Sequence, residues 1–399
     1  MKVSAIICEY NPLHNGHLHH IQETRRHGAT HIICVLSSNF VQRGDAALLS
    51  KFDRAGLAVK AGADLVLELP TPFSCAAAEV YASGAVSLLD QLGVVDELSF
   101  GSSMGDIESI ALLTEASLST TRIYGERIRE RMKQGDSYPA AVWVIIRQRY
   151  GSQVAEKMQD PNNLLAIEYM KAMQKQKVTF SAYTIPRRIV LHDSDKPSGH
   201  YASASFIRKS VMEGENYADF MPSFVARRLA DCIREGRVAS FRQLERVSLY
   251  RMRTASPEYL LALPDANEAL VSRFIAARTA NSLEEMLMQV KTRCYTMARI
   301  RRIVISALLG IRSDSARTPV PYARVLAFSD RGRELMGIAK GKSRIPISTS
   351  LAKLRQEGGS AEAFVKMEER ASHVYGLAQR RISSAEEDFR ARIVMEDRA

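Results

Sequence analysis

Two histidines flank a glycine near the start of the chain, in the sequence His14-Asn15-Gly16-His17. Spaced three residues apart at the beginning of a helix, the two imidazoles would lie on one face of its first turn. The free N–H groups and the positive dipole end of such a turn suit a phosphate. Imidazole donors can also stabilise charge that develops on phosphoryl oxygens. This pattern therefore indicates chemistry on a nucleotide phosphate.

A second group of polar residues lies much later, at Ser203-Ala204-Ser205. Ser203 is a good N-cap for the helical stretch that follows, and Ser205 adds a second hydroxyl. Arg208 returns one turn later on the same side. Hydroxyls, free N–H groups and a guanidinium are what a leaving pyrophosphate needs. We therefore assign Ser203, Ser205 and Arg208 to phosphate binding, and His14, His17 and Arg208 to catalysis.

The elements that must position these residues alternate regularly through the first half of the chain. Short, β-branched apolar runs alternate with amphipathic stretches, which is typical of a parallel sheet covered on both faces by helices. The expected strands are Val3–Cys8, His31–Leu36, Asp64–Leu69, Glu97–Phe100 and Val178–Ile185. The expected helices are Gly16–Arg26, Phe52–Ala61, Cys75–Gln91 and Ile107–Leu118. The histidine motif would thus open the helix that follows the first strand.

From about Asn216 onward the strand pattern disappears and helical periodicity dominates, as in Phe224–Arg234, Glu268–Arg278 and Arg299–Leu309. Gly214-Glu215-Asn216 supplies a break between the two parts. We therefore expect an α/β fold with two domains. A parallel-sheet, Rossmann-like catalytic domain would span residues 1–215, and a mainly α-helical domain would span residues 216–399.

The positive charge of the chain is concentrated in its second half. The net charge is +11, from 55 Lys and Arg and 44 Asp and Glu. Residues 1–200 hold 21 basic and 21 acidic side chains, so the excess lies in residues 201–399. Two stretches there, 286–313 and 335–356, contain no acidic residue. This asymmetry favours a polyanionic partner for the second half. The alternative is a helical domain whose arginines are simply solvated.

Other interpretations of the histidine motif stay open. His14, His17, His19 and His20 could form a metal site with Cys8, although this spacing matches no standard zinc pattern. Surface histidines at a helix start are a second alternative. The sequence contains neither G-x-G-x-x-G nor G-x-x-x-x-G-K-[ST], which disfavours a dinucleotide-binding domain and a P-loop.

Bulk properties narrow the class of protein. No apolar run approaches the ~18 residues of a membrane span, so we expect no membrane association. The five cysteines are odd in number and dispersed, which is typical of reduced thiols in the cytoplasm. No protein partner is evident.

These motifs resemble those of the HIGH-motif nucleotidyltransferases, which have H-x-G-H after the first strand and a second motif similar to I-S-S-T-x-I-R. Within that superfamily, the chain resembles the bacterial tRNA(Met) cytidine acetate ligases over nearly its whole length. The similarity is densest at residues 9–17, 38–44 and 62–70, and it continues through 100–102, 161–163 and 203–205. Ser205 stands where family members often have threonine, a difference that keeps the hydroxyl.

The resemblance implies an ATP-dependent ligation in two steps. An acetate carboxylate attacks the α-phosphate of ATP and gives acetyl-adenylate and pyrophosphate. N4 of the wobble cytidine of elongator tRNA(Met) then takes the acetyl group and releases AMP. Mg²⁺ is expected as counter-charge for the phosphates. The implied ATP-binding residues are Ile7, Cys8, Glu9, Tyr10, Asn11, Pro12, Leu13, His14, Asn15, Gly16, His17, Leu18, His19, His20, Gly101, Asn162, Arg187 and Arg188.

The polyanion that meets the basic second half would then be the tRNA. Basic side chains near Tyr295 could follow an RNA backbone while an unpaired cytidine enters the ATP cleft. The residues expected to contact tRNA are Lys291, Arg293, Arg299, Arg301 and Arg302. The main alternative function is a small-molecule cytidylyl- or adenylyltransferase of cofactor or lipid-precursor synthesis, and a third is a non-catalytic RNA-binding protein. The acetate pocket is not defined by the sequence, with Ser37, Ser38, Asn39 and Asp53 as plausible members.

Overall fold

The computed structural model describes residues 1–136, 138–186, 197–391 and 393–396. Its main sheet has the strand order β10-β8-β5-β2-β1-β6-β7, with β9 beside β8. The pairs are parallel except for β5 and β8, which are antiparallel. The strands are β1 (Val3–Cys8), β2 (His31–Ser37), β5 (Leu65–Leu69), β6 (Glu97–Ser102), β7 (Ser181–Pro186), β8 (Ala323–Ser329), β9 (Ile347–Ser348) and β10 (Val394–Glu396).

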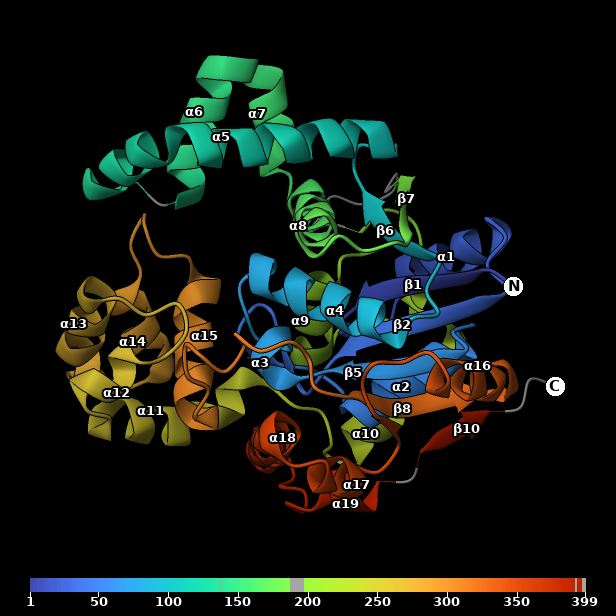
Figure 1. The fold of residues 1–399 in the computed structure, drawn as a ribbon. Coiled ribbons are helices and arrows are strands. Elements are labelled where there is room, and N and C mark those ends of the chain that lie inside the picture. The colour runs from blue at the N-terminus through green and yellow to red at the C-terminus, as the bar shows by residue number, and fades with distance from the viewer. Residues whose placement is uncertain (137, 187–196, 392, 397–399) are drawn as a thin grey trace.

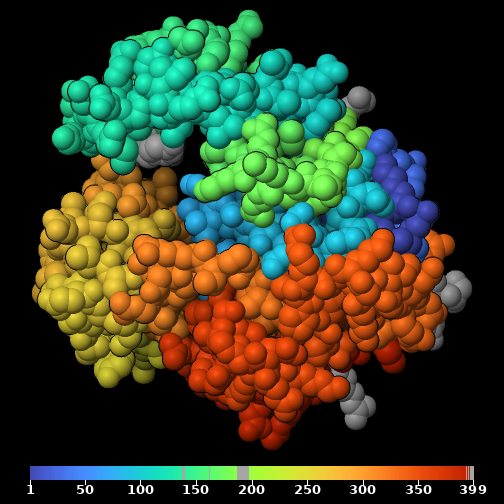
Figure 2. All heavy atoms as spheres, viewed as in Figure 1, coloured from blue at the N-terminus to red at the C-terminus, as the bar shows by residue number. Residues whose placement is uncertain are grey.

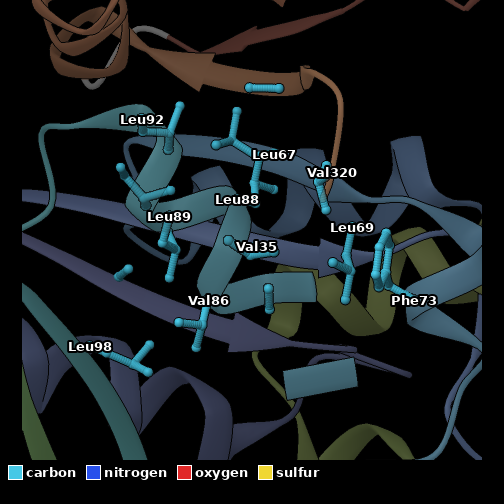
Figure 3. Packing of buried hydrophobic residues seen from close by; sticks show 14 of the residues in the cluster. Val35, Leu67, Leu69, Phe73, Val86, Leu88, Leu89, Leu92, Leu98 and Val320 are labelled. Atoms are coloured by element: carbon cyan, nitrogen blue, oxygen red, sulfur yellow. The ribbon is translucent and has the colours of Figure 1, made fainter. Parts of the chain in front are cut away.

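Alternate side chains of the strands enter two separate cores, one on each face of the sheet. Val3 and Ala5 of β1 pack under α4 (Ala78–Leu92) and α8 (Pro161–Gln176). Ile6 and Cys8 of the same strand pack against helices on the opposite face. Those helices are α1 (Asn15–Arg26), α2 (Lys51–Lys60), α9 (Ala204–Glu213) and α10 (Ser223–Arg234). Figure 3 shows the first core, where leucines of α4 meet Val35 and Leu67 of the sheet. Burial on both faces explains why these strands are continuous apolar runs.

The predicted alternation of the first half is confirmed. All five expected strands and all four expected helices are present, and apart from the end of the fourth helix their ends differ by a few residues. The fourth helix is longer than expected, because α5 runs from Ile107 to Lys133. The helices predicted at Phe224–Arg234, Glu268–Arg278 and Arg299–Leu309 correspond to α10, α13 (Glu268–Ala276) and α15 (Met297–Leu309).

The expectation that no strand follows residue 216 is wrong. Strands β8, β9 and β10 all come from the second half and extend the main sheet beyond β5. Arg324 places a charge in the apolar run of β8, so the sequence pattern does not indicate a buried strand there. Arg324 is nevertheless buried, because Glu68 of β5 accepts a hydrogen bond from its guanidinium at 3.0 Å. The predicted boundary between residues 215 and 216 therefore does not divide the sheet from the helices.

Two helical parts extend beyond the sheet (Figure 1). The first, which we call the arm, consists of α5, α6 (Tyr138–Tyr150) and α7 (Ser152–Gln159), inserted after β6. It has a small core of its own at Ile128, Ala141 and Ile145. The second, which we call the helical block, consists of α11 (Glu245–Thr254), α12 (Pro257–Leu261), α13, α14 (Leu283–Val290) and α15.

The last four helices follow β8 in the chain and lie at the end of the sheet where β8, β9 and β10 are paired. They are α16 (Asp330–Lys340), α17 (Leu351–Gln356), α18 (Gly359–Ala378) and α19 (Glu387–Arg390), and a short α3 (Thr71–Ser74) follows β5. A separate hairpin, β3 (Phe40–Val41) and β4 (Asp45–Ala46), follows β2. Phe40 and Ala46 of this hairpin belong to the core of the helical block. The block is thereby attached to the carboxyl end of β2.

Among the residues that the structure describes, no helix is both long and apolar enough to cross a membrane.

Candidate functional site

The histidine motif opens α1 directly after the turn that ends β1. His14 is the N-cap of α1, and its Nδ1 accepts a hydrogen bond from the Gly16 N–H at 3.1 Å. The backbone N–H of His14 donates in turn to Nδ1 of His17 at 3.3 Å. The two imidazoles stack with their centroids 3.6 Å apart. The sequence expectation of two imidazoles on one face of the first turn is therefore confirmed.

These backbone contacts fix which ring nitrogen carries the proton. Nδ1 of His14 and Nδ1 of His17 both act as acceptors, so a neutral ring must carry its proton on Nε2. Each histidine thus presents an N–H donor from the far side of its ring. Donors in this arrangement suit a phosphate at the N-terminus of α1, where the helix dipole adds positive potential.

The turn before the motif is held mostly by side chains that point into the protein. Cys8, Tyr10 and Leu13 are buried in the core under α1 and α2. The buried Asn11 accepts the Leu48 N–H through Oδ1 at 2.7 Å, next to a cis peptide bond between Asn11 and Pro12. A nucleotide along residues 7–13 would therefore meet mainly backbone. His19 and His20 diverge, since His20 Nε2 lies 3.1 Å from Ser99 Oγ whereas His19 faces Glu23.

The second motif lies against the first. Nη1 of Arg208 donates to the carbonyl of Asn11 at 2.7 Å. Nδ2 of Asn15 donates to the carbonyl of His200 at 2.8 Å. Ser203 caps α9 by accepting the Phe206 N–H at 3.1 Å, and its hydroxyl lies 3.0 Å from that of Ser205. Two motifs nearly 200 residues apart thus meet at one place.

The third side of the site is the carboxyl end of β6. Because β1 is paired with β2 on one side and β6 on the other, the chain order reverses between β1 and β6. Such a switch point is where open α/β sheets bind ligands. Gly101 lies on β6, and Asn162 donates through Nδ2 to the Ser103 hydroxyl at 3.3 Å. Asn162 at the start of α8 is therefore at the expected edge. Arg187 and Arg188 lie outside the described residues.

A buried arginine that the motifs did not reveal connects these loops. Arg54 on α2 is fully buried, and its hydrogen bonds to the described residues all go to backbone carbonyls. Its Nη1 reaches the carbonyls of Glu9 at 2.7 Å and Ser37 at 3.0 Å, and its Nη2 reaches that of Ser38 at 2.6 Å. Burial lowers the pKa of the Arg54 guanidinium from its ordinary value. Arg54 thereby holds the carboxyl ends of β1 and β2 together.

The plausible pocket residues have structural partners instead. Asp53 accepts from Arg228 at 2.8 Å and pairs with Arg237 at 3.2 Å. The buried Asn39 accepts the Lys51 N–H at 2.8 Å. The hydroxyl of Ser38 donates to Glu368 of α18 at 2.9 Å. These contacts hold the loop after β2 in place through its own side chains. They do not define an acetate pocket.

Glu368 is a second buried residue that sequence reasoning missed. Its carboxyl also accepts the Thr71 N–H at 2.5 Å and the Thr71 hydroxyl at 2.8 Å. Burial, together with the nearby charge of Glu68, raises the pKa of Glu368 to about 8. Helix α18 thus supports the ends of both β2 and β5 through one carboxyl group.

The five residues expected to contact tRNA fall into two groups. Lys291 and Arg293 are exposed in the loop before α15. Arg299 donates to the carbonyl of Asp265 at 2.7 Å, and Arg302 pairs with the carboxylate of Asp265 at 2.7 Å. Arg301 faces Asp45 at 3.9 Å. The last three therefore have structural contacts within the block and with the β3–β4 hairpin.

We expect that only glycine at position 44 allows the β3–β4 hairpin to pack closely against α15. Its φ is +70°, and an added Cβ would lie within 2.6 Å of the Arg301 carbonyl carbon and closer still to the Arg302 nitrogen. Gly44→Ala should therefore lower the free energy of unfolding by about 1–3 kcal/mol, measured by urea denaturation. Gly337→Ala is the control, because Gly337 is helical with no atom within 4 Å of its added Cβ. Equal urea midpoints for Gly44→Ala and the wild type would contradict this account.

The metal-site interpretation of the histidines gains no support. Within the described ranges, no three His, Cys, Asp or Glu side chains are grouped so that they could hold a metal ion. The thiol of Cys8 lies in the core of the sheet and donates to the Val35 carbonyl.

Comparisons with known proteins agree with this geometry. A family model described as HIGH Nucleotidyl Transferase matches residues 1–389. The tRNA(Met) cytidine acetate ligase of Alkaliphilus metalliredigens is 34% identical over 95% of this chain and 94% of the relative. The protein of the same name from Thermoanaerobacter sp. is 35% identical over 98% of both chains.

Two solved structures have the same overall fold as this chain. The apo crystal structure of Thermotoga maritima TmcAL superposes with a TM-score of 0.94 at 27% identity, covering 100% of both chains. The same protein bound with alpha-thio ATP gives a TM-score of 0.91, also at 27% identity and full coverage of both chains. With a family model over nearly the whole chain and full-length relatives above 30% identity, this protein belongs to the HIGH nucleotidyl transferase family and, within it, to the tRNA(Met) cytidine acetate ligases.

Proposed function

We propose that this enzyme uses ATP to activate acetate as acetyl-adenylate and then acetylates N4 of the wobble cytidine of elongator tRNA(Met). Pyrophosphate leaves in the first step and AMP in the second. The observation that carries the proposal is the meeting of both motifs at the β1–β6 switch point, where Arg208 donates to the Asn11 carbonyl. A site for small-molecule transfer alone would not account for the basic second half.

ATP would lie along the backbone of residues 7–20, with Gly101 and Asn162 beside it. The Nε2 donors of His14 and His17 would stabilise the charge that moves onto the α-phosphate as acetate attacks. Arg208 and the hydroxyls of Ser203 and Ser205 would face the pyrophosphate. Arg187 and Arg188 remain expected ATP contacts. Mg²⁺ would neutralise phosphate charge and, because no carboxylate cage is present among the described residues, would be held mainly by ATP itself.

The tRNA would approach between the arm and the helical block. Figure 2 shows a hollow there, between the teal arm and the yellow-to-orange block. The thiol of Cys294, in the loop before α15, donates to the Gly135 carbonyl at the tip of the arm, so the two parts touch beside this hollow. Lys291 and Arg293 are exposed in that same loop. Basic side chains at such an opening would meet RNA phosphates first.

Charge reversal at this loop should weaken tRNA binding. We expect Lys291→Glu with Arg293→Glu to lower tRNA affinity at least about tenfold and to reduce the slope of log affinity against log salt by about 2. The KM for ATP should stay unchanged. The matched control is Arg331→Glu with Arg333→Glu, two exposed arginines on α16. An unchanged salt slope in the first variant would remove this loop from the RNA interface.

The decisive experiment incubates the purified protein with ATP, Mg²⁺, radiolabelled acetate and unmodified elongator tRNA(Met). Label in the RNA that requires ATP, and that nuclease digestion places in N4-acetylcytidine, is the expected result. Pyrophosphate release with another small substrate, and no label in RNA, would replace the proposal with a small-molecule nucleotidyltransferase. RNA binding with no ATP turnover would indicate a non-catalytic RNA-binding protein.

A further inference from the structure

We infer that the carboxylate of Glu9 accepts the proton that the cytidine N4 amine loses as it attacks acetyl-adenylate. This inference rests on the proposed function and adds the base for its second step. The argument depends on where Glu9 lies, on what holds it and on which of its oxygens is available.

Glu9 occupies the position between the end of β1 and the histidine motif. Its backbone carbonyl accepts from Nη1 of Arg54 at 2.7 Å. Its Oε1 accepts the N–H of Gln42, in the β3–β4 hairpin, at 3.0 Å. The side chain is thus held from two directions, at the strand end where the nucleotide is expected. A group held this way needs little reorganisation when it acts.

The second oxygen of Glu9 is available. Across the described part of the chain, Oε2 has no hydrogen bond, and no cationic nitrogen lies within 4.0 Å of the carboxylate. Glu9 is half-buried, and Oε2 is not among the buried atoms without a partner, so it is accessible to solvent. The charge of Arg208, from the second motif, acts on this carboxylate. Burial raises the pKa of Glu9, and the charges of Arg208, Arg43 and Arg54 oppose that rise without reversing it. A carboxylate whose pKa is moved toward neutrality is a better base at neutral pH.

Other polar side chains at the site are less suited to accept a proton. Nδ1 of both His14 and His17 already accepts a backbone N–H, so each ring presents a donor to the site. Asp45 is a second half-buried acid near Arg208, but it faces Arg301 at 3.9 Å and accepts from backbone N–H groups. Oε2 of Glu9 is therefore both accessible and without a hydrogen bond to any described residue.

The chemistry of the step balances with Glu9 as base. N4 attacks the acetyl carbonyl carbon and forms the C–N bond. The bond from that carbon to the AMP oxygen breaks, and AMP leaves with the electron pair. One N4 proton passes to Oε2 of Glu9. The same carboxylate would accept an N4–H hydrogen bond before reaction, which favours cytosine over uracil, whose O4 is an acceptor.

The test separates the two steps with Glu9→Gln, which preserves the acceptor for the Gln42 N–H. Because ATP would meet the backbone of residue 9 and not its carboxylate, we expect acetate-dependent exchange between ATP and labelled pyrophosphate to fall much less than transfer does. Single-turnover transfer from preformed acetyl-adenylate to tRNA should fall about 10²–10⁴-fold. The wild-type transfer rate should decline toward acid pH as Glu9 is protonated, and the variant should lack this decline. Asp45→Asn is the matched control, with an unchanged ratio of transfer to exchange.

Three results would overturn the inference. Equal losses of exchange and transfer in Glu9→Gln would mean that Glu9 shapes the nucleotide site and is not the base. Unchanged transfer would assign proton removal to another group. A similar loss of transfer in Asp45→Asn would show a general effect of charge in the hairpin. If the wild type itself shows no acetate-dependent exchange, the proposed function fails instead, whatever the Glu9 variant does.

Discussion

Replacing His17 by alanine is expected to lower the rate of acetate-dependent ATP–pyrophosphate exchange by about 10²–10³-fold. The Nε2 donor of His17 is lost, and so is the ring that stacks on His14 at 3.6 Å. Because this donor would act on charge that develops only in the transition state, kcat should fall while the KM for ATP changes little. Steady-state exchange kinetics over a range of ATP concentrations measure kcat and the KM for ATP separately.

Arg26→Ala is the control for this prediction. Arg26 lies in the last turn of the same helix, and its exposed side chain pairs with Glu23. Its exchange rate should match the wild type. A His17→Ala enzyme with normal kcat and a raised KM would mean that His17 only helps to bind ATP. Normal values of both would remove the motif from the reaction.

Replacing Lys51 by methionine is expected to cost about 3–5 kcal/mol of unfolding free energy. Lys51, Glu68, Arg324 and Asp388 form a fully buried ionic cluster. Nζ of Lys51 lies 2.6 Å from Glu68 and 2.7 Å from Asp388. Although burial alone would raise the pKa of Glu68, the charges of Lys51 and Arg324 lower it to about 2. Methionine would leave Arg324 as the cation that pairs with both Glu68 and Asp388, and it would also remove the ammonium that lies 3.8 Å from Glu368.

Urea denaturation at neutral pH measures this loss, and Lys366→Met is its control. Lys366 is exposed and pairs with Glu362 one turn away on α18, so its loss should cost well under about 1 kcal/mol. A Lys51→Met protein as stable as the wild type would show that the cluster relaxes by taking up a proton. In that case the stability of the variant should fall steeply as the pH is raised.

The sheet of the first half could be predicted because local rules decide it. Strands buried on both faces are continuous apolar runs, and the histidine motif was expected to open the helix that follows the first strand. Ser203 as the cap of α9 was predictable for the same reason. These are interactions between residues close in sequence, and the pattern of residue types is sufficient to find them.

The rest could not be predicted because it depends on residues far apart in sequence. Arg54 looks like a solvated helix arginine until its carbonyl partners at Glu9, Ser37 and Ser38 are brought together. Because a charged residue in a strand suggests exposure, Arg324 makes β8 look unlike a buried strand. Its partner Glu68 is 256 residues away in the sequence. Glu9 belonged to the predicted nucleotide loop, but no local pattern indicated that one of its oxygens would be left without a partner.

The antiparallel pairing of β5 with β8 has a consequence for how the protein is made. β5 ends at Leu69 and β8 begins at Ala323, so the ribosome must add the intervening chain before the partner strand exists. At elongation rates of about 5–20 residues per second this takes roughly tens of seconds. During that time the apolar edge of β5 has no neighbour, and unpaired edges of this kind invite aggregation. The synthesis of β8 therefore sets the time for which this edge of the nascent sheet stays unpaired.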